Sequence, residues 1–131
     1  SSHQNWPTYS KSSTGLETIC EKTVNPSATG VIFKVTFDCN YQIGGHGSDS
    51  FISELLANNS RIAFKRQIYG SNTGSGTRGA VVFPITGIYK TTSTNSVTFS
   101  VKVARDGNHT NDTIDIYRNN GLAFIIEEIK D

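Results

Sequence analysis

Short stretches of alternating apolar and polar residues run through most of this chain and are clearest in its last third. The stretch Ser96–Ala104 places Val97, Phe99 and Val101 at every second position, and Thr113–Tyr117 repeats the alternation. Successive side chains of a β-strand point to opposite faces, so these valines and the phenylalanine would share one face. The pattern predicts strands with one buried and one wet face.

Nine such runs are expected to be strands. They are Glu17–Val24, Val31–Cys39, Phe51–Leu56, Arg61–Tyr69, Ala80–Ile85, Gly87–Thr91, Ser96–Ala104, Thr113–Tyr117 and Leu122–Ile129. Residues that favour turns, chiefly Asn, Gly and Pro, stand between them. So many short strands predict an all-β fold, specifically an antiparallel β-sandwich of jelly-roll type.

Two local patterns make more specific predictions. Asn120-Gly121 between two apolar stretches is the signal of a type I′ turn and predicts a hairpin there. The segment Ser48–Asn58 has a capping sequence and a helical spacing of Phe51 and Leu55, but it is short. A helix and a strand are therefore both open for that segment.

The last expected strand, Leu122–Ile129, is apolar in its first part without alternation. A strand of this kind is either central in its own core or covered on its outer face by another subunit. Both alternatives remain open from the sequence.

Length and composition indicate one domain over residues 1–131, with residues 1–16 as an irregular arm leading from an upstream region. Ser, Thr, Asn and Gly supply 53 of the 131 residues, and the formal net charge is +1. Such a balance offers no basic surface for nucleic acid. No apolar run has the roughly 18 residues needed to span a bilayer, so membrane insertion is not expected.

The two cysteines, Cys20 and Cys39, fall on separate expected strands. A disulfide can join them if those strands are neighbours. Cysteines in a chain with so few of them are also often buried thiols, so the pairing stays open.

One turn carries oxygen-bearing side chains at alternate positions. These residues are Asp106, Asn108, Thr110 and Asp112, a spacing found in calcium loops. The loop glycine is replaced by Asn111, and the expected glutamate by Tyr117. We therefore expect no cofactor, with Ca²⁺ at these four residues as a weak alternative.

No arrangement of residues typical of catalysis is visible. His46, Ser48 and Asp49 are close in sequence, but no nucleophile motif surrounds the serine. Glu127 and Glu128 are consecutive on a strand, so they face opposite ways and cannot act on one bond. The sequence predicts that this protein is not an enzyme.

Three segments resemble the jelly roll of the C1q/TNF-like family: Val82–Tyr89, Val97–Val101 and Ile114–Gly121. The ending Phe124–Ile129 and the upstream Gly74–Arg78 are similar to C-terminal domains of bacteriophage tail fibres and tailspikes. The matching positions are structural, namely Phe83, Gly87, Tyr89, Phe99, Gly121 and Phe124. The resemblance implies a homotrimer at the tip of a fibre on the virion.

The function expected from this resemblance is that of a distal receptor-binding domain that attaches to host-surface carbohydrate. Aromatic and polar residues near the turns are the candidate carbohydrate contacts: Trp6, Tyr41, His46, Asp49, Tyr69 and Arg78. The aromatic residues among them also fit the rim of the core. Two alternatives are a trimerisation and folding cap without a ligand, and a secreted C1q/TNF-like recognition domain.

Overall fold

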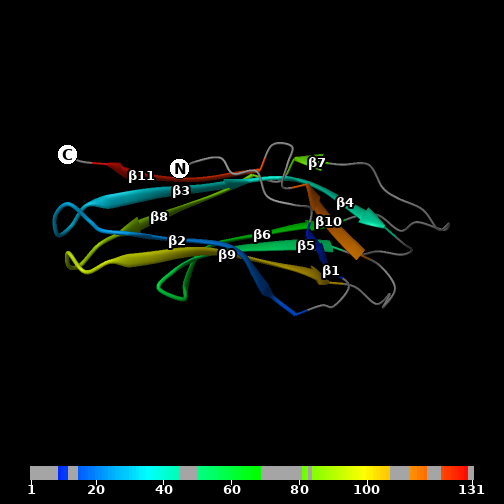
Figure 1. The fold of residues 1–131 in the computed structure, drawn as a ribbon, viewed down its shortest axis with the longest axis horizontal. Helices are drawn as coiled ribbons and strands as arrows, with labels where there is room; N and C mark the ends of the chain where they lie inside the picture. Colours follow the sequence, from blue (N-terminus) through cyan, green and yellow to red (C-terminus); the bar gives the residue numbers. More distant parts are fainter. Residues whose placement is uncertain are drawn as a thin grey trace.

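A computed structural model gives the fold and describes most of the chain. It describes residues 9–11, 15–44, 50–68, 81–82, 84–106, 113–117 and 122–129, with side chains over 15–39, 51–66, 84–104 and 122–129. Every regular element within these ranges is a strand (Figure 1). The strands are β1 (Tyr9–Lys11), β2 (Glu17–Val24), β3 (Ile32–Asp38), β4 (Asn40–Gly44), β5 (Ser50–Ala57), β6 (Ser60–Ile68), β7 (Val81–Val82), β8 (Ile85–Lys90), β9 (Val97–Asp106), β10 (Thr113–Tyr117) and β11 (Ala123–Ile129).

Strands β3 and β4, and likewise β7 and β8, are two halves of one interrupted strand. Phe37 pairs with Ile85 and Asn40 pairs with Val82, so the antiparallel register passes through the interruption without a shift. This register places Asp38 opposite Pro84. Proline has no N–H to donate to the ladder, and the pairing breaks where it stands.

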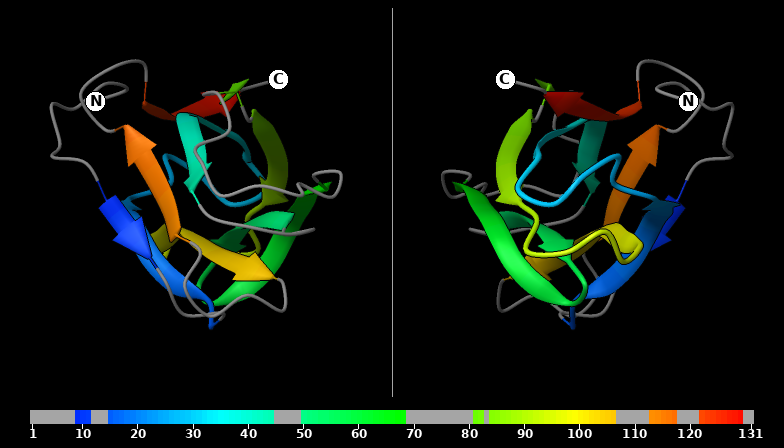
Figure 2. Two further views of the ribbon diagram at one scale, coloured as in Figure 1. Left: turned by 90° about the vertical axis from the view of Figure 1, so that its right-hand side faces the viewer. Right: turned by 90° about the vertical axis from the view of Figure 1, so that its left-hand side faces the viewer.

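The pairing of strands is that of a jelly roll. One layer has the orders β11-β3-β8 and β1-β10-β4-β7, and the other has the order β2-β9-β5-β6. When β3–β4, β7–β8 and the successive strands β10 and β11, which both pair along β3–β4, each count as one strand, the orders are first-eighth-third-sixth and second-seventh-fourth-fifth. This is the winding of one long antiparallel ribbon into two layers. Seen end-on, the layers curve around a common interior (Figure 2). The predicted fold class is confirmed.

The core lies between the two layers and follows the predicted alternation. Val97, Phe99 and Val101 of β9 are buried, and they face Phe33 and Val35 of β3. The Phe33 and Phe99 rings meet edge to face, with centroids 5.4 Å apart. Aromatic pairs in this geometry add packing energy beyond the area that they bury.

Strands β5 and β6 form a two-residue hairpin, so the helical alternative for residues 48–58 is wrong where the structure describes that segment. Asn58 and Asn59 both have positive φ, 48° and 67°, as a type I′ turn requires. Asparagine tolerates this conformation better than most residues. Because β5 has β9 on one side and β6 on the other, sheet pairing outweighs the short helical spacing.

The hairpin predicted at Asn120-Gly121 does not form between the flanking strands. Strand β10 pairs with β1 and β4, whereas β11 pairs with β3. Both strands lie along the long β3–β4 strand, and both run antiparallel to it. The local turn signal was outweighed by this long partner, and residues 118–121 themselves lie outside the described part of the chain.

Two strands were not predicted. Tyr9–Lys11 forms β1 against β10, within the arm that was expected to be irregular. Asn40–Gly44 forms β4, between the strands expected at Val31–Cys39 and Phe51–Leu56. Tyr9–Lys11 is too short to show an alternation, and in Asn40–Gly44 only Tyr41 and Ile43 alternate with polar residues. Both stretches pair with β10, which runs between them.

The two layers approach closely at β6 and β8. A Cβ added to Gly87 on β8 would lie 2.9 Å from Ile62 Cδ1 and 3.3 Å from Ala63 Cβ on β6. The Lys65 Nζ donates a hydrogen bond to the Pro84 carbonyl over 2.8 Å, across the same junction. A side chain at position 87 would force the Ile62 side chain to move, and this side of the sandwich is closed by that contact.

Candidate functional site

Most of the predicted carbohydrate contacts lie outside the described residues. Trp6, His46, Asp49, Tyr69 and Arg78 are in this group. Tyr41 is in β4, where the backbone but not the side chain is described. The prediction for these six residues therefore remains a prediction.

The calcium site predicted from the sequence also lies mostly outside the described residues. Asn108, Thr110 and Asp112 lie outside the described residues, and Asp106 ends β9 opposite Ser50, with its side chain not described. Among the residues that are described, no group of three His, Cys, Asp or Glu side chains could hold a metal ion. No described helix could cross a membrane.

The strand ends that flank these predicted residues share one end of the sandwich. Ser50 pairs with Ile68 and with Asp106, and Thr113 pairs with Gly44. These ends of β4, β5, β6, β9 and β10 lie toward the right of Figure 1. The opposite end carries the turn between β2 and β3, for which side chains are described.

A hollow of about 420 Å³ lies at this opposite end. Its lining comes from the turn between β2 and β3, the start of β3 and the last residue of β11: Ser27, Ala28, Thr29, Gly30, Val31, Ile32 and Ile129. Ile32 and Ile129 are cross-strand partners. Its volume is within the range of about 300–1,000 Å³ typical of small-molecule pockets.

Hydrogen bonds from neighbouring strands hold the turn beside the hollow. The Ser27 amide donates to Glu128 Oε1 over 2.7 Å, and the Gly30 amide donates to Thr91 Oγ1 over 3.0 Å. The Thr91 amide donates in turn to the Val31 carbonyl over 3.0 Å. Gly30 has a φ of 81°, which glycine adopts without strain. The turn is therefore fixed at three points before any ligand arrives.

The lining of the hollow is neutral and mixed in character. None of its seven residues has an ionisable side chain. Ser27 and Thr29 bring hydroxyl groups, while Ile32 and Ile129 bring apolar walls. Such a lining can bind a neutral ligand that has both hydroxyl groups and an apolar face. It offers no side chain for acid–base chemistry.

Sequence reasoning missed this site. The residues between Glu17–Val24 and Val31–Cys39 predict only a turn, and Ile129 is predicted only as the end of the last strand. The residues meet because β11 pairs with β3, a contact across almost a hundred positions of sequence. A terminal strand that pairs beside the turn at residue 30 is not readable from either segment alone.

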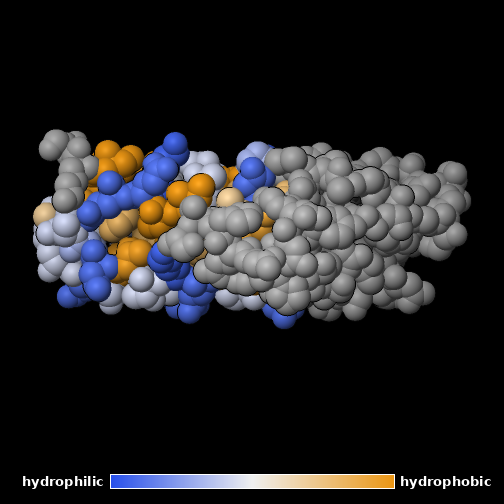
Figure 3. Space-filling view, turned by 45° about the horizontal axis from the view of Figure 1, so that its top comes forward, coloured by the Kyte–Doolittle hydropathy of each residue, from blue (hydrophilic) through white to orange (hydrophobic). Residues whose placement is uncertain are grey.

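The outer face of the β11-β3-β8 sheet exposes isoleucines. Ile88 is 56% exposed and Ile129 is 43% exposed. In the register of the sheet, Lys34 stands between Glu127 and Ile88. Figure 3 shows apolar residues on this face, interrupted by hydrophilic ones.

The terminal strand β11 is buried at its start and exposed at its end. Leu122 and Phe124 are buried in the core of their own chain. Ile129, further along β11, is exposed on the outer face. The first part of the strand is thus a core strand, and its end leaves apolar surface uncovered.

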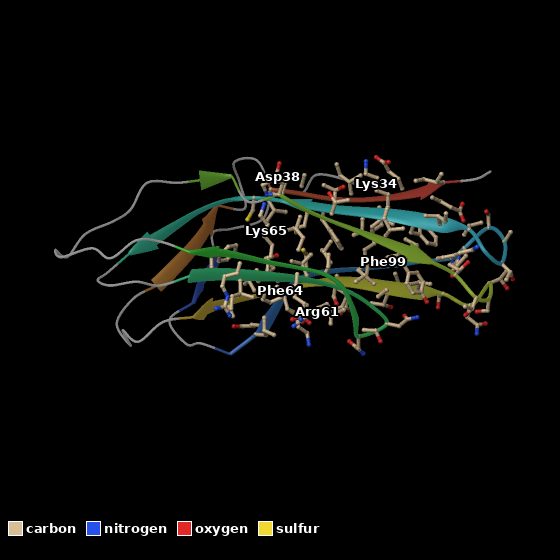
Figure 4. The ribbon with its side chains drawn as sticks, turned by 180° about the vertical axis from the view of Figure 1, so that it is seen from behind. Lys34, Asp38, Arg61, Phe64, Lys65 and Phe99 are labelled. Carbon is tan, nitrogen blue, oxygen red and sulfur yellow. The ribbon has the colours of Figure 1, made fainter. Side chains whose placement is uncertain are left out.

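The outer face of the other sheet is different because apolar residues on it are buried. Glu54 on β5 pairs with Arg61 on β6, with 3.0 Å between Oε2 and Nη2. The Arg61 guanidinium lies 4.5 Å from the centroid of the Phe64 ring. Ile52 and Leu56 on the same face are buried. Figure 4 shows Arg61 and Phe64 on the side of the molecule away from Lys34.

Neither cysteine is in a disulfide, and both are buried. Cys20 is in β2, and Cys39 lies between β3 and β4 in the other layer. Burial, and secondly the Asp38 carboxylate, raises the pKa of the Cys39 thiol far above its usual range. Cys39 is therefore a neutral thiol at physiological pH and a poor nucleophile.

Comparisons with known proteins add little beyond the fold. No protein-family model matches the chain, and no curated protein matches it by sequence. Among solved structures, the C-terminal domain of EclA, described as a sugar-binding protein, aligns with a TM-score of 0.45 and 14% identity. The alignment covers 92% of this chain and 76% of that chain. Similarity this weak decides neither family nor function, which depend on the residues described above.

Proposed function

We propose that this protein binds carbohydrate, as the distal receptor-binding domain of a viral attachment fibre of the phage tail-fibre or tailspike kind. The observation that carries the proposal is the neutral hollow beside residues 27–31. A sugar ring has hydroxyl groups at its edge and C–H groups on its faces. The hydroxyls of Ser27 and Thr29 can form hydrogen bonds with the hydroxyl groups of a sugar, and the walls of Ile32 and Ile129 can pack against its C–H groups.

The proposal assigns binding and no reaction to this chain. The hollow has no ionisable side chain, whereas glycoside hydrolysis generally uses a pair of carboxyl groups. Binding through hydroxyl groups and apolar walls needs no cofactor. We therefore propose a non-enzymatic role without a cofactor, located at the fibre tip on the virion.

Self-association is the second part of the proposal. Ile88 and Ile129 leave apolar surface on the outer face of the β11-β3-β8 sheet, next to charges of both signs at Lys34 and Glu127. A second copy of this chain is the occupant that we assign to the face. Three copies in a trimer would present three hollows, and weak single contacts then add up to useful avidity.

A panel of host-surface oligosaccharides tests the binding role, with substitutions that fill the hollow. Ala28→Trp places an indole in the hollow, and Ala28 is exposed without positive φ. Thr94→Trp is the matched control, because Thr94 is exposed on the turn between β8 and β9. We expect Ala28→Trp to weaken binding at least about tenfold and Thr94→Trp to leave it unchanged.

Equal loss in both variants, or no binding to any oligosaccharide, contradicts the proposal. Circular dichroism and thermal unfolding of both variants show whether the sheet is retained. A variant that keeps the wild-type spectrum and midpoint but loses binding has lost the hollow and nothing else.

The alternative of a trimerisation and folding cap has one observation in its favour. The exposed isoleucines need a cover whether or not the hollow binds a ligand. A stable trimer that binds no saccharide would favour the cap. For the secreted C1q/TNF-like domain, a bridge between Cys20 and Cys39 would have counted in favour, but no disulfide joins them.

A further inference from the structure

A second arrangement of polar and aromatic side chains lies away from the hollow, on the outer face of the β2-β9-β5-β6 sheet. Glu54 and Phe64 are cross-strand partners on β5 and β6. A register shift between Leu55 and Leu56 places Arg61 opposite Leu56, one step nearer the turn on the same face. Glu54, Arg61 and Phe64 thus form one cluster, the Arg61 cluster.

Arg61 is held in place from two sides while most of its donors remain available. Its Nη2 contacts Glu54 Oε2 at 3.0 Å, and its guanidinium lies 4.5 Å from the Phe64 ring centroid. A guanidinium has five N–H donors, and the Arg61 side chain is 53% exposed. Its orientation is therefore set before a ligand binds, which lowers the entropy lost on binding.

The charges around Arg61 favour an anion. Glu54 is 8% exposed at its side chain, and its charge is neutralised by Arg61. Lys102 on β9 is the cross-strand partner of Glu54 and adds a further positive charge in the same row. Arg61, Lys102 and Glu54 together carry a charge of +1, and the next acidic residue in the row of Arg61 is Glu21, three strands away on β2.

The Phe64 ring adds an apolar surface beside this charge. It is 44% exposed although it stands on a sheet face where Ile52 and Leu56 are buried. An exposed aromatic ring packs well against the C–H face of a sugar. A planar guanidinium beside it matches a carboxylate in a two-point contact, which a lysine ammonium cannot reproduce.

We propose that the Arg61 cluster binds the carboxylate of an acidic saccharide of the uronic-acid class, with the sugar ring against Phe64. This inference rests on the proposed carbohydrate-binding function and names a substrate class for it. The neutral hollow and the Arg61 cluster lie on different parts of the surface, so each can be changed without the other.

The test compares methyl glucuronide with methyl glucoside, which differ only in the carboxylate. Titrations of ¹⁵N-labelled protein followed by NMR give both dissociation constants and the amides that respond. The variants are Arg61→Lys, which keeps the charge and the ion pair but loses the planar fork, and Phe64→Leu, which keeps apolar volume. Lys22→Gln, on β2 at the opposite edge of the sheet from β6, is the control for charge.

We expect the glucuronide to bind about tenfold more tightly than the glucoside, with shifts of amides in β5 and β6. Arg61→Lys should lower the preference for the glucuronide about tenfold. Raising the salt from about 0.01 M to about 1 M should also weaken that preference. Phe64→Leu should weaken binding of both sugars, and Lys22→Gln should change neither.

Equal affinity for the two sugars, or a preference that survives Arg61→Lys, overturns the assignment of an acidic ligand. If neutral oligosaccharides still bind and Ala28→Trp still abolishes that binding, the proposed function stands without this inference. If no saccharide of either kind binds, both the inference and the proposed function fail.

Discussion

The outer faces of the two sheets are built on the same strand pattern but differ in the exposure of their apolar residues. On the β2-β9-β5-β6 sheet, Ile52 and Leu56 point outward and are nevertheless buried beside the pair of Glu54 and Arg61. On the β11-β3-β8 sheet, Ile88 and Ile129 point outward and stay about half exposed.

The difference shows that an apolar residue on an outer face is either covered by its own chain or left exposed. Long charged side chains of the same chain can lie over it, since arginine and lysine bury their stems while the charged group stays in water. Without such cover, the apolar surface is left for a partner. The first face is complete in one chain, and the second is the face that we assign to a sister copy.

The largest expected effect comes from separating the layers that carry the two faces. Gly87→Val puts a branched side chain where Ile62 and Ala63 leave no room. We expect the free energy of unfolding to fall by about 1–3 kcal/mol, measured by urea denaturation. Gly15→Val is the control, because nothing lies within 4 Å of a Cβ there. Equal midpoints for the two variants would contradict the close approach.

A smaller effect is expected from removing a charge on each face. Glu54 and Glu127 both stand opposite a lysine in their sheets, Lys102 and Lys34 respectively. Glu54→Gln removes a buried charged partner of Arg61 and should cost about 1–2 kcal/mol. Glu127→Gln, on the exposed face, should change stability by less than about 0.5 kcal/mol. A larger loss of stability for Glu127→Gln than for Glu54→Gln would show that the outer face of the β2-β9-β5-β6 sheet does not depend on the ion pair of Glu54 and Arg61.

The smallest effect on stability is expected for Ile88→Lys. Ile88 is more than half exposed, so the isolated chain should lose less than about 0.5 kcal/mol in dilute solution. The same substitution should abolish self-association, because a lysine charge would be buried in the contact. Thermal unfolding at low concentration measures the first effect, and analytical ultracentrifugation measures the second. Retained association would place the contact elsewhere.

Much of the fold was predictable because most of the strands follow a two-residue alternation. The run Val97–Val103 reads as a strand and is one, and the layers follow the predicted jelly-roll class. The errors arose where a local signal competes with a distant partner. The turn signal at Asn120-Gly121 predicts a hairpin, but β10 and β11 instead pair along β3–β4.

The site was much less predictable than the fold. The hollow joins Gly30 with Ile129, and the Arg61 cluster depends on a register shift in the β5–β6 hairpin. Neither relation has a sequence motif, because both follow from pairing register and from which side chains remain uncovered. Aromatic residues near turns were the only available signal, and Phe64 is in the middle of a strand.

The most direct test of the account is the molar mass in solution, measured by multi-angle light scattering over a wide range of concentration. The account predicts a particle of three chains of 14.3 kDa each, about 43 kDa, for the wild type. It predicts a single chain of 14.3 kDa for Ile88→Lys. A wild-type protein that stays at 14.3 kDa at the highest concentration would contradict the claim that sister copies cover the isoleucine face.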